Sequence, residues 1–330
     1  MSYFNIKGRP HIRQGFTLIE LLVVIVIIGI LASLIMVGAT AARKTVRQGI
    51  TKTEITSFDA ALENYRTQYG EYPPDFSDEA AVLRHVRKRW PNFNWFNQSQ
   101  NFGGFCKLVD IATGYDFTTV SEHGIDKSRG SHIGALAFWL GGIPNESIGM
   151  LGGFSADVTN PLGLRANANA NSDPSRENIT QWDSKSQFLD LTLGKNCDVV
   201  DKLPVVIANG YPIAYFKASA AGKYLQKGTT NETLCFHFHF SNPEWSDLSI
   251  GVPYAKVENN GPDDAVWHNP KSFQLIHPGI DGKFSVAEND PNFEEFRTID
   301  PGKDVRQGLT LADDDNQANF GGNTIETSGN

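Results

Sequence analysis

The chain has 330 residues, 40% of them hydrophobic, which is enough for one large or two ordinary domains with a buried core and excludes a disordered protein. Its 29 Lys and Arg against 37 Asp and Glu give a net charge of −8, which argues against a nucleic-acid-binding protein because such proteins carry a basic face. Cys106, Cys197 and Cys235 are too few and too widely spaced for a disulfide framework or a CxxC metal site. One disulfide at most can form, and the sequence does not select the pair.

Residues 21–42 form an uncharged and mainly apolar run of 22 residues directly after Glu20. As a helix the run spans roughly 33 Å, which matches the hydrocarbon thickness of a bilayer and predicts a transmembrane helix. A carboxylate near the bilayer core costs about 2.5–3.5 kcal/mol, but the apolar side chains outweigh one acid. A secretory signal peptide would have a shorter apolar stretch and a small-residue cleavage site. A plain signal anchor, with Glu20 snorkelling to the interface, fits the length but gives the acid no use.

The hexapeptide GFTLIE at residues 15–20 follows a short basic leader and resembles the processing and methylation motif of type IV pilins and type II secretion pseudopilins. The resemblance implies that prepilin peptidase cuts between Gly15 and Phe16, so that residues 1–15 are a leader peptide and Phe16 becomes the N-methylated N-terminus. In pilin filaments the acid at the place of Glu20 faces the N-terminal amine of a neighbouring subunit, here Phe16 of another copy. Such pairing is physically reasonable because a buried charge is tolerated only when it is paired.

Residues 16–42 are therefore expected to be the transmembrane and assembly helix. Positive residues flank it on both sides, so their count does not decide the orientation: Lys7, Arg9 and Arg13 precede it, and Arg43, Lys44, Arg47 and Lys52 follow. The resemblance implies a single-pass protein of the bacterial inner membrane with its N-terminus inside and its head in the periplasm. It also implies four partners: prepilin peptidase, other copies of the chain, minor pilins or pseudopilins, and the inner-membrane assembly platform.

Residues 43–70 continue the helix with an amphipathic pattern. Apolar side chains recur at spacings near three and four and predict one face that packs on a globular head; they are Ile50, Ile55, Phe58, Leu62, Tyr65 and Tyr69. Gly70 supplies a stop, and Pro73-Pro74 forbids continuation. The sequence thus predicts one helix of some fifty residues. The stretch ALENYRTQYGEYPP also resembles the end of this helix in pseudopilins.

Residues 71–200 are interpreted as a large insertion of helices and loops. We expect a helix around residues 78–90 and a second apolar helix at GALAFWLGG, residues 134–142. The low-complexity segment ANANANSDPS from Ala166 is typical of an exposed loop. The aromatic stretch WPNFNWF, residues 90–96, is expected to lie in the core, with a ligand-stacking site as the alternative.

Residues 201–330 have the alternating pattern of strands separated by Gly, Asn and Pro turns. The predicted strands are LPVVIA, YPIAYFK, TLCFHFHF and SFQLIH, and an antiparallel sheet is their natural product. Residues 210–215 resemble the glycine-x-proline-x-x-tyrosine hairpin with which the sheet of the major pseudopilin begins. The expected fold class is therefore α+β: a pilin-like fold in which the long N-terminal helix packs on an antiparallel sheet, with the large insertion between them.

The C-terminal part contains two acidic stretches, HPGIDGKFS and LADDDNQANF. In the major pseudopilin similar motifs contribute to a calcium site, and the resemblance places Asp281, Asp313 and Asp314 in it, with Asn319-Phe320 following. Calcium prefers six to eight oxygen ligands, which carboxylates and loop carbonyls supply. The long separation of Asp281 from Asp313 and the extra acid at Asp315 depart from the family pattern, and a solvated acidic loop is the alternative.

Cys235, His237 and His239 alternate in CFHFHF, so in a strand all three point to one face. A zinc or copper site is conceivable, but without a fourth ligand a polar outer face of a half-buried strand is favoured. The sequence contains no GxSxG elbow, phosphate loop, HExxH or paired-carboxylate signature of catalysis.

The sequence as a whole predicts a non-enzymatic structural subunit of a type II secretion pseudopilus or a type IV pilus. It leaves open which filament is formed and whether the chain is the major or a minor subunit. The alternative is a membrane-tethered extracytoplasmic binding protein or enzyme that uses a pilin-type leader.

Overall fold

The structure of the chain is a computed structural model. It divides into two compact units, Met1–Arg47 and Gln48–Asn330, and the second is called the head unit below. The described residues are 16–114, 132–145, 147–169, 172–200, 203–224, 238–242, 245–251, 253–257, 265–279, 282, 284, 297–300, 305–307 and 316–320.

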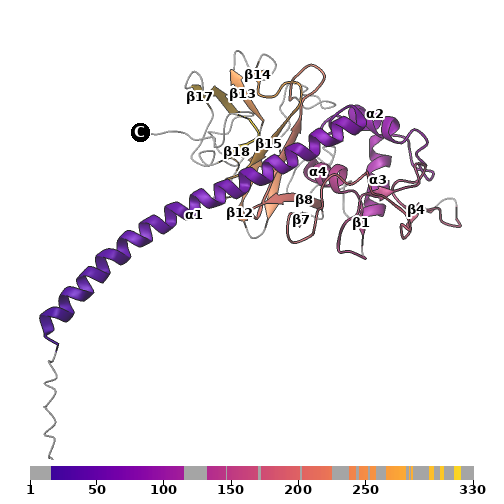
Figure 1. Ribbon diagram of the computed structural model, residues 1–330. Coiled ribbons are helices and arrows are strands. Elements are labelled where there is room, and N and C mark those ends of the chain that lie inside the picture. Colours follow the sequence, from indigo (N-terminus) through magenta and orange to yellow (C-terminus); the bar gives the residue numbers. More distant parts are fainter. Residues whose placement is uncertain are drawn as a thin grey trace, which may run out of the picture. The chain divides into compact units, whose positions relative to one another are not determined.

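Helix α1 (Leu18–Tyr69) is one continuous helix of 52 residues (Figure 1), as the sequence predicts. Its stretch Leu18–Met36 is the only helix among the described residues that is long and apolar enough to cross a membrane. Its side chains are exposed, with Leu18 at 85% and Met36 at 71%. A helix that is apolar all round, with no other described residue covering it, is suited to lipid or to identical neighbours.

The part of α1 in the head unit buries a narrow stripe of side chains. Thr51, Ile55, Phe58, Leu62 and Tyr65 are each at most 5% exposed and follow one another at spacings of four and three. This stripe confirms the predicted face with one correction: Ile50 is 45% exposed, because it lies one residue away from the stripe and Thr51 takes the buried position. The helix ends where Gly70 adopts a positive φ of 77°, which is the predicted stop.

The described part of the insertion contains three helices: α2 (Glu79–Arg89), α3 (Phe102–Thr113) and α4 (His132–Gly141). The first and third confirm the predicted helices. Asp78 caps α2 by accepting a hydrogen bond from the amide of Ala81, and Asn101 caps α3 in the same way at Gly104. Helix α3 was not expected, since its sequence starts with Phe-Gly-Gly. Gly104 is required there because a Cβ would lie 1.9 Å from the carbonyl oxygen of Ser99.

The described part of the insertion also contains three short two-stranded sheets: β1 (Pro144–Asn145) with β2 (Met150–Leu151), β3 (Phe154–Ser155) with β6 (Trp182–Asp183), and β4 (Leu164–Arg165) with β5 (Ser175–Arg176). The aromatic stretch at residues 90–96 supplies core, as predicted, with Trp90 and Phe93 buried. The described residues 166–169 and 172–173 are exposed, as expected of a loop.

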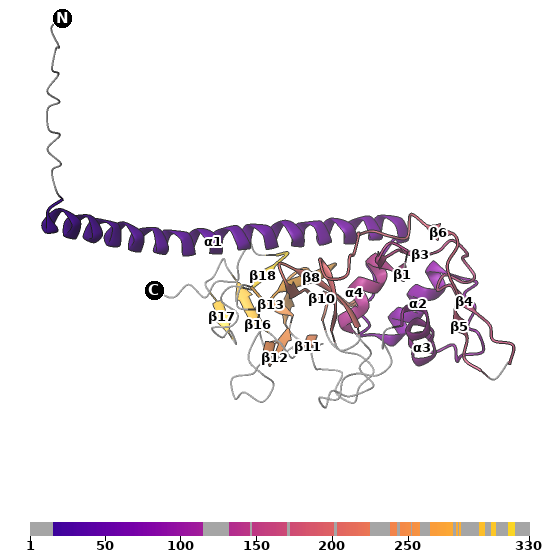
Figure 2. The same ribbon diagram turned by 90° about the horizontal axis from the view of Figure 1, so that it is seen from below.

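The strands after residue 196 are mainly antiparallel, as the sequence predicts, and in the described residues they are distributed over several small sheets. The pairs are antiparallel except β13 with β16, which is parallel. Their bounds are β7 (Cys197–Val200), β8 (Leu203–Ala208), β9 (Tyr211–Pro212), β10 (Ala214–Lys217), β11 (Phe238–Asn242), β12 (Trp245–Gly251), β13 (Tyr254–Val257), β14 (Val266–Trp267), β15 (Phe273–His277), β16 (Arg297–Asp300), β17 (Val305–Gln307) and β18 (Gln317–Ala318). Figure 2 shows β13, β16 and β18 at one end of the head unit and α2, α3 and β4–β6 at the other.

The predicted hairpin at residues 203–217 forms with one change. β8 coincides with the predicted strand, and Asn209 (φ 46°) and Gly210 (φ 87°) make the tight turn to β9. The predicted strand YPIAYFK is divided at Ile213, because β9 pairs with β8 whereas β10 pairs with β15. Pro212 has no N–H for a longer ladder, and the chain passes here from one sheet to the next.

His277, at the end of β15, is fully buried and uncharged. Its Nε2 lies 2.9 Å from the carbonyl oxygen of Ala208, and its Nδ1 accepts a hydrogen bond from the amide of Gly279. Nε2 therefore carries the proton. Burial lowers the pKa of His277 from its ordinary 6.5 to about 4.

Replacement of His277 by Gln should flatten the dependence of stability on pH. The unfolded chain binds a proton at about pH 6.5, whereas the folded chain does so only near pH 4, so stability is lost as the pH falls through this window. The loss attributable to His277 is on the order of 3 kcal/mol. Urea unfolding of wild type and His277→Gln at pH 7, 6 and 5 measures it, and parallel pH profiles for the two proteins would contradict the assignment.

Candidate functional site

The first turn of α1 is closed by a reciprocal pair of side chains, Thr17 and Glu20. The amide and the hydroxyl of Thr17 donate hydrogen bonds to Oε2 of Glu20 at 2.9 and 2.7 Å, and the amide of Glu20 lies 3.3 Å from Oγ1 of Thr17. This is a capping box, in which a helix-end Thr and the acid three residues later satisfy each other's backbone N–H groups.

The capping box gives Glu20 a role within its own chain that the sequence analysis missed. The signal was available, because Thr-x-x-Glu before an apolar run is the capping-box pattern. Phe16 precedes the box and is 79% exposed, while Gly15 lies outside the described residues. All hydrogen bonds to the Glu20 carboxylate from the described part of the chain reach Oε2.

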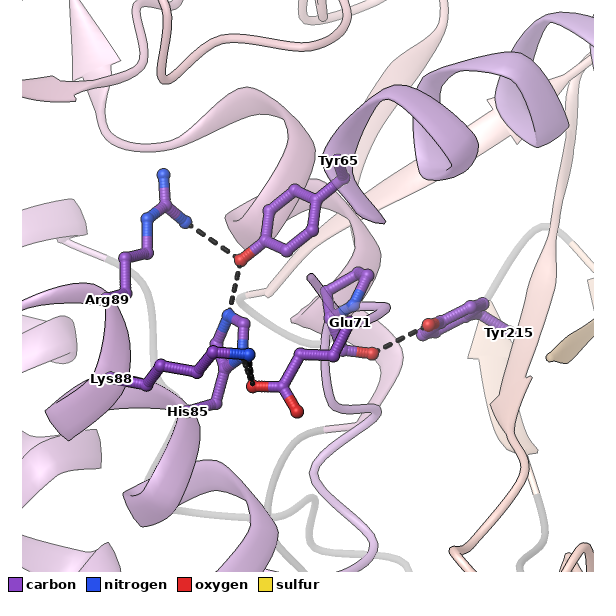
Figure 3. Close-up of polar contacts among 7 residues, drawn as sticks. Tyr65, Glu71, His85, Lys88, Arg89 and Tyr215 are labelled. Atoms are coloured by element: carbon purple, nitrogen blue, oxygen red, sulfur yellow. Dashed lines mark hydrogen bonds and ion pairs between the residues drawn. The ribbon is translucent and has the colours of Figure 1, made fainter. Parts of the chain in front are cut away.

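The other end of α1 meets the insertion at a buried polar cluster (Figure 3). The hydroxyl of Tyr65 lies 2.6 Å from Nε2 of His85 on α2 and accepts a hydrogen bond from Nη1 of Arg89 at 3.0 Å. On its far side, His85 Nδ1 lies 2.8 Å from Oε1 of Glu71, which also lies 3.5 Å from Nζ of Lys88. Helix α1 and the insertion are thus joined by hydrogen bonds as well as by apolar contact.

The protonation states in this cluster follow from its geometry. The hydrogen bond from His85 holds the pKa of Glu71 at about 2, so Glu71 is an acceptor and Nδ1 of His85 carries the proton. Burial keeps the pKa of His85 below its ordinary value, so the ring is neutral and Nε2 accepts from Tyr65. Burial also raises the pKa of Tyr65. The hydrogen bonds therefore run in one direction, from Arg89 through Tyr65 and His85 to Glu71.

Arg89 is held by aromatic rings rather than by a carboxylate. Its guanidinium carbon lies 4.4 Å from the ring centre of Tyr69, 4.6 Å from that of Trp90 and 4.5 Å from that of Phe154. Such contacts attract a cation to the ring faces. Its Nε and Nη2 atoms are buried and have no acceptor among the described residues. Tyr65 and His85 at the centre of the cluster are buried, whereas Glu71 and Lys88 at its outer end are partly exposed.

Two motifs singled out in the sequence are in contact. The hydroxyl of Tyr215, from the hairpin motif, donates a hydrogen bond of 2.7 Å to the carbonyl oxygen of Pro73, from the end of the helix motif (Figure 3). Nearby, the amide of Lys217 donates to Oδ2 of Asp75 at 2.7 Å. Burial raises the pKa of Asp75, against the hydrogen bonds that it accepts. The segment after α1 is thereby tied to strand β10, 142 residues along the chain.

The C-terminal segment also reaches α1. Nδ2 of Asn319 donates to Oδ1 of Asp59 at 3.0 Å, and Oδ1 of Asn319 accepts from the amide of Leu275 on β15. Phe320 stacks on the ring of His268 at 4.4 Å. These contacts fix the positions of Asn319 and Phe320, the asparagine-aromatic pair that follows the predicted calcium ligands in the sequence.

The predicted calcium ligands Asp281, Asp313 and Asp314 lie outside the described residues, as do Asp315 and the side chains of Cys235, His237 and His239. Among the residues that the structure describes, no three His, Cys, Asp or Glu side chains are grouped as a metal site would require. The calcium site stays a prediction.

Cys106 and Cys197 are buried free thiols, so they do not form a disulfide with each other. Burial raises the pKa of both and that of Cys197 to about 12, which makes them unreactive.

Comparison with known proteins gives matches at the N-terminus and beyond. Residues 11–36 match the family described as the prokaryotic N-terminal methylation motif. The chain is 38% identical over 135 residues to the type II secretion system core protein G of Aeromonas hydrophila, a match that covers 92% of that protein and 36% of this chain. It is 37% identical over 70 residues to the protein of the same name from Pectobacterium carotovorum, covering 45% of that protein and 21% of this chain. No solved structure gives a significant match.

Removal of the Tyr65 hydroxyl should destabilise the head. In Tyr65→Phe the buried Nε2 of His85 and Nη1 of Arg89 both lose their partner, at a cost of about 1–3 kcal/mol. In the double variant Tyr65→Phe/His85→Leu the second change should cost less than it does alone, since residues in one hydrogen-bond network are coupled. Urea unfolding of the four proteins measures the coupling, and additive effects would show that the hydrogen bond contributes nothing.

Proposed function

The chain belongs to the pseudopilin family of type II secretion, and we propose that it is a structural subunit that assembles through α1 into a type II pseudopilus or a type IV pilus. One observation carries this proposal: the methylation motif at residues 11–36 coincides with a helix stretch whose apolar side chains are exposed on all sides. In an assembled filament, those side chains would be covered by the same stretch of neighbouring copies.

Assembly first requires processing. Prepilin peptidase would cut between Gly15 and Phe16 and methylate Phe16, so that a positive ammonium group appears one residue before the capping box. The apolar stretch would hold the processed chain in the inner membrane as a single pass, with the head in the periplasm. The further partners are other copies of the chain, minor pseudopilins and the assembly platform of the inner membrane.

The capping box suggests how Glu20 takes part in assembly. Thr17 occupies Oε2, and no hydrogen bond from the described residues reaches Oε1. One carboxylate oxygen can therefore cap the chain's own helix while the other accepts the ammonium of Phe16 from an adjacent copy. A charge-assisted hydrogen bond of this kind is about twice as strong as a neutral one, and water is absent to compete with it.

The intact mass of the mature protein tests the processing. We expect a chain that starts at Phe16 and is one methyl group heavier than residues 16–330. In cells without prepilin peptidase, the mass should be that of the full chain. A mature N-terminus at Met1, or at another site, would overturn the proposed cleavage.

Substitutions of Glu20 test the assembly role and separate its two functions. Glu20→Gln keeps the capping box, because Gln also serves at this position, but removes the charge. Glu20→Ala removes both. We expect both variants to insert in the membrane and to abolish filaments, scored by electron microscopy and by immunoblot of sheared material.

Glu63→Gln, an exposed acid on the same helix, is the matched control and should assemble as wild type does. Filaments at the wild-type level from Glu20→Gln would contradict the charge pairing and leave the glutamate with its capping role alone. Loss of filaments in Glu63→Gln would instead show that α1 tolerates no change of charge.

A further inference from the structure

A small pocket lies among the short two-stranded sheets of the insertion. Its volume is about 190 Å³, and its walls come from β1, β5, β6 and the segment between β5 and β6. Figure 2 shows these elements gathered at the end of the head unit that contains α2 and α3. The pocket is separate from the cluster around Tyr65, and none of its residues takes part in the proposed assembly.

The pocket walls are closely packed and linked to each other. A Cβ on Gly152 would lie 2.7 Å from Cβ of Asn145 and 3.3 Å from the ring of Trp182, and one on Gly163 would lie 2.5 Å from Ile179. Nη2 of Arg176 donates a hydrogen bond of 2.7 Å to the carbonyl oxygen of Pro144, which joins β5 to β1. These contacts hold the lining side chains in place before a ligand arrives, which lowers the cost of binding.

Half of the lining residues are apolar, among them the flat aromatic side chain of Trp182, and the other half are polar with no net charge. Trp182 is partly buried against the core and partly open to the pocket. The polar lining residues are Asn145, Ser147, Arg176, Glu177 and Asn178. The guanidinium and the carboxylate are neighbours in the chain and cancel in charge, while the amides and the hydroxyl supply both donors and acceptors. An anion would face Glu177 and a cation would face Arg176, whereas a neutral ligand that carries hydroxyl groups can approach both side chains without repulsion.

We propose that this pocket binds one ring of a neutral saccharide. A sugar ring offers hydroxyl groups to the amides and to both charged side chains, and its C–H face packs on the ring of Trp182. The pocket volume of about 190 Å³ falls below the usual 300–1,000 Å³ of pockets for drug-sized ligands, so the pocket suits a single ring. The head would thus recognise carbohydrate, either free sugar or the units of a polysaccharide.

Saturation-transfer NMR on the full chain tests the proposal. The protein is solubilised in a detergent without a sugar headgroup, because a maltoside would compete. The probes are glucose, galactose, mannose and N-acetylglucosamine, each also as an oligosaccharide, with acetate and sulfate as charged comparators. We expect saturable transfer to at least one neutral sugar and none to the two anions. A preference for the oligosaccharide would identify polysaccharide as the source, and equal binding would identify free sugar.

Three variants assign the binding to the pocket. Trp182→Ala should weaken the affinity about tenfold, and Asn178→Ala, an exposed side chain whose loss leaves the core intact, about threefold. Trp95→Ala, another partly buried tryptophan of the insertion, does not line the pocket and should bind as wild type does. The absence of transfer to every sugar, transfer to the anions, or equal binding by wild type and Asn178→Ala would overturn the proposal.

Discussion

The packing of helix α1 on the insertion depends on the hydrogen-bond partners of one buried hydroxyl group, that of Tyr65. Tyr65 is the last member of the buried stripe of α1, and its ring packs among apolar side chains while its hydroxyl has no access to water. A buried hydroxyl without a partner is costly, so an acceptor and a donor must be brought to it. His85 and Arg89 of α2 provide both. The buried face of helix α1 therefore packs against the insertion as well as against strands of the head unit.

The insertion shares a hydrophobic core with the rest of the head. One cluster of buried side chains contains Leu62 from α1, Trp139 from α4 and Tyr215 from β10. Residues that form one core fold together, so the insertion cannot be removed without exposing the apolar stripe. Arg89 shows the same dependence, because rings from α1, α4 and β3 and the ring of Trp90, which directly follows α2, surround its guanidinium. The insertion is therefore part of the same hydrophobic core as the pilin-like fold.

Much of this fold could be predicted because its signals are local. The period of α1, its end at Gly70 and the strand β8 follow from side-chain spacing and turn residues that lie next to one another in the chain. The two failures differ: α3 depends on a local close approach of Gly104 to the backbone of Ser99, which its Phe-Gly-Gly start does not reveal, whereas the division at Ile213 depends on the distant strand β15 being the partner of β10. Nothing local could show that His85 contacts Tyr65, because the pairing exists only once α2 has packed.

The capping box changes the energetic account of Glu20. Were the carboxylate bare in lipid, its whole desolvation cost would favour any partner that brought a positive charge. It is not bare, since it accepts two hydrogen bonds from Thr17 and satisfies an amide at the helix start. If this stretch lies in the membrane, as proposed, these hydrogen bonds lower the desolvation free energy of the carboxylate. They would also lower the free energy gained when the carboxylate pairs with an ammonium group. In the proposed filament, pairing at Glu20 would set the axial register of neighbouring copies, while the contact between apolar helix faces would supply most of the attraction between them.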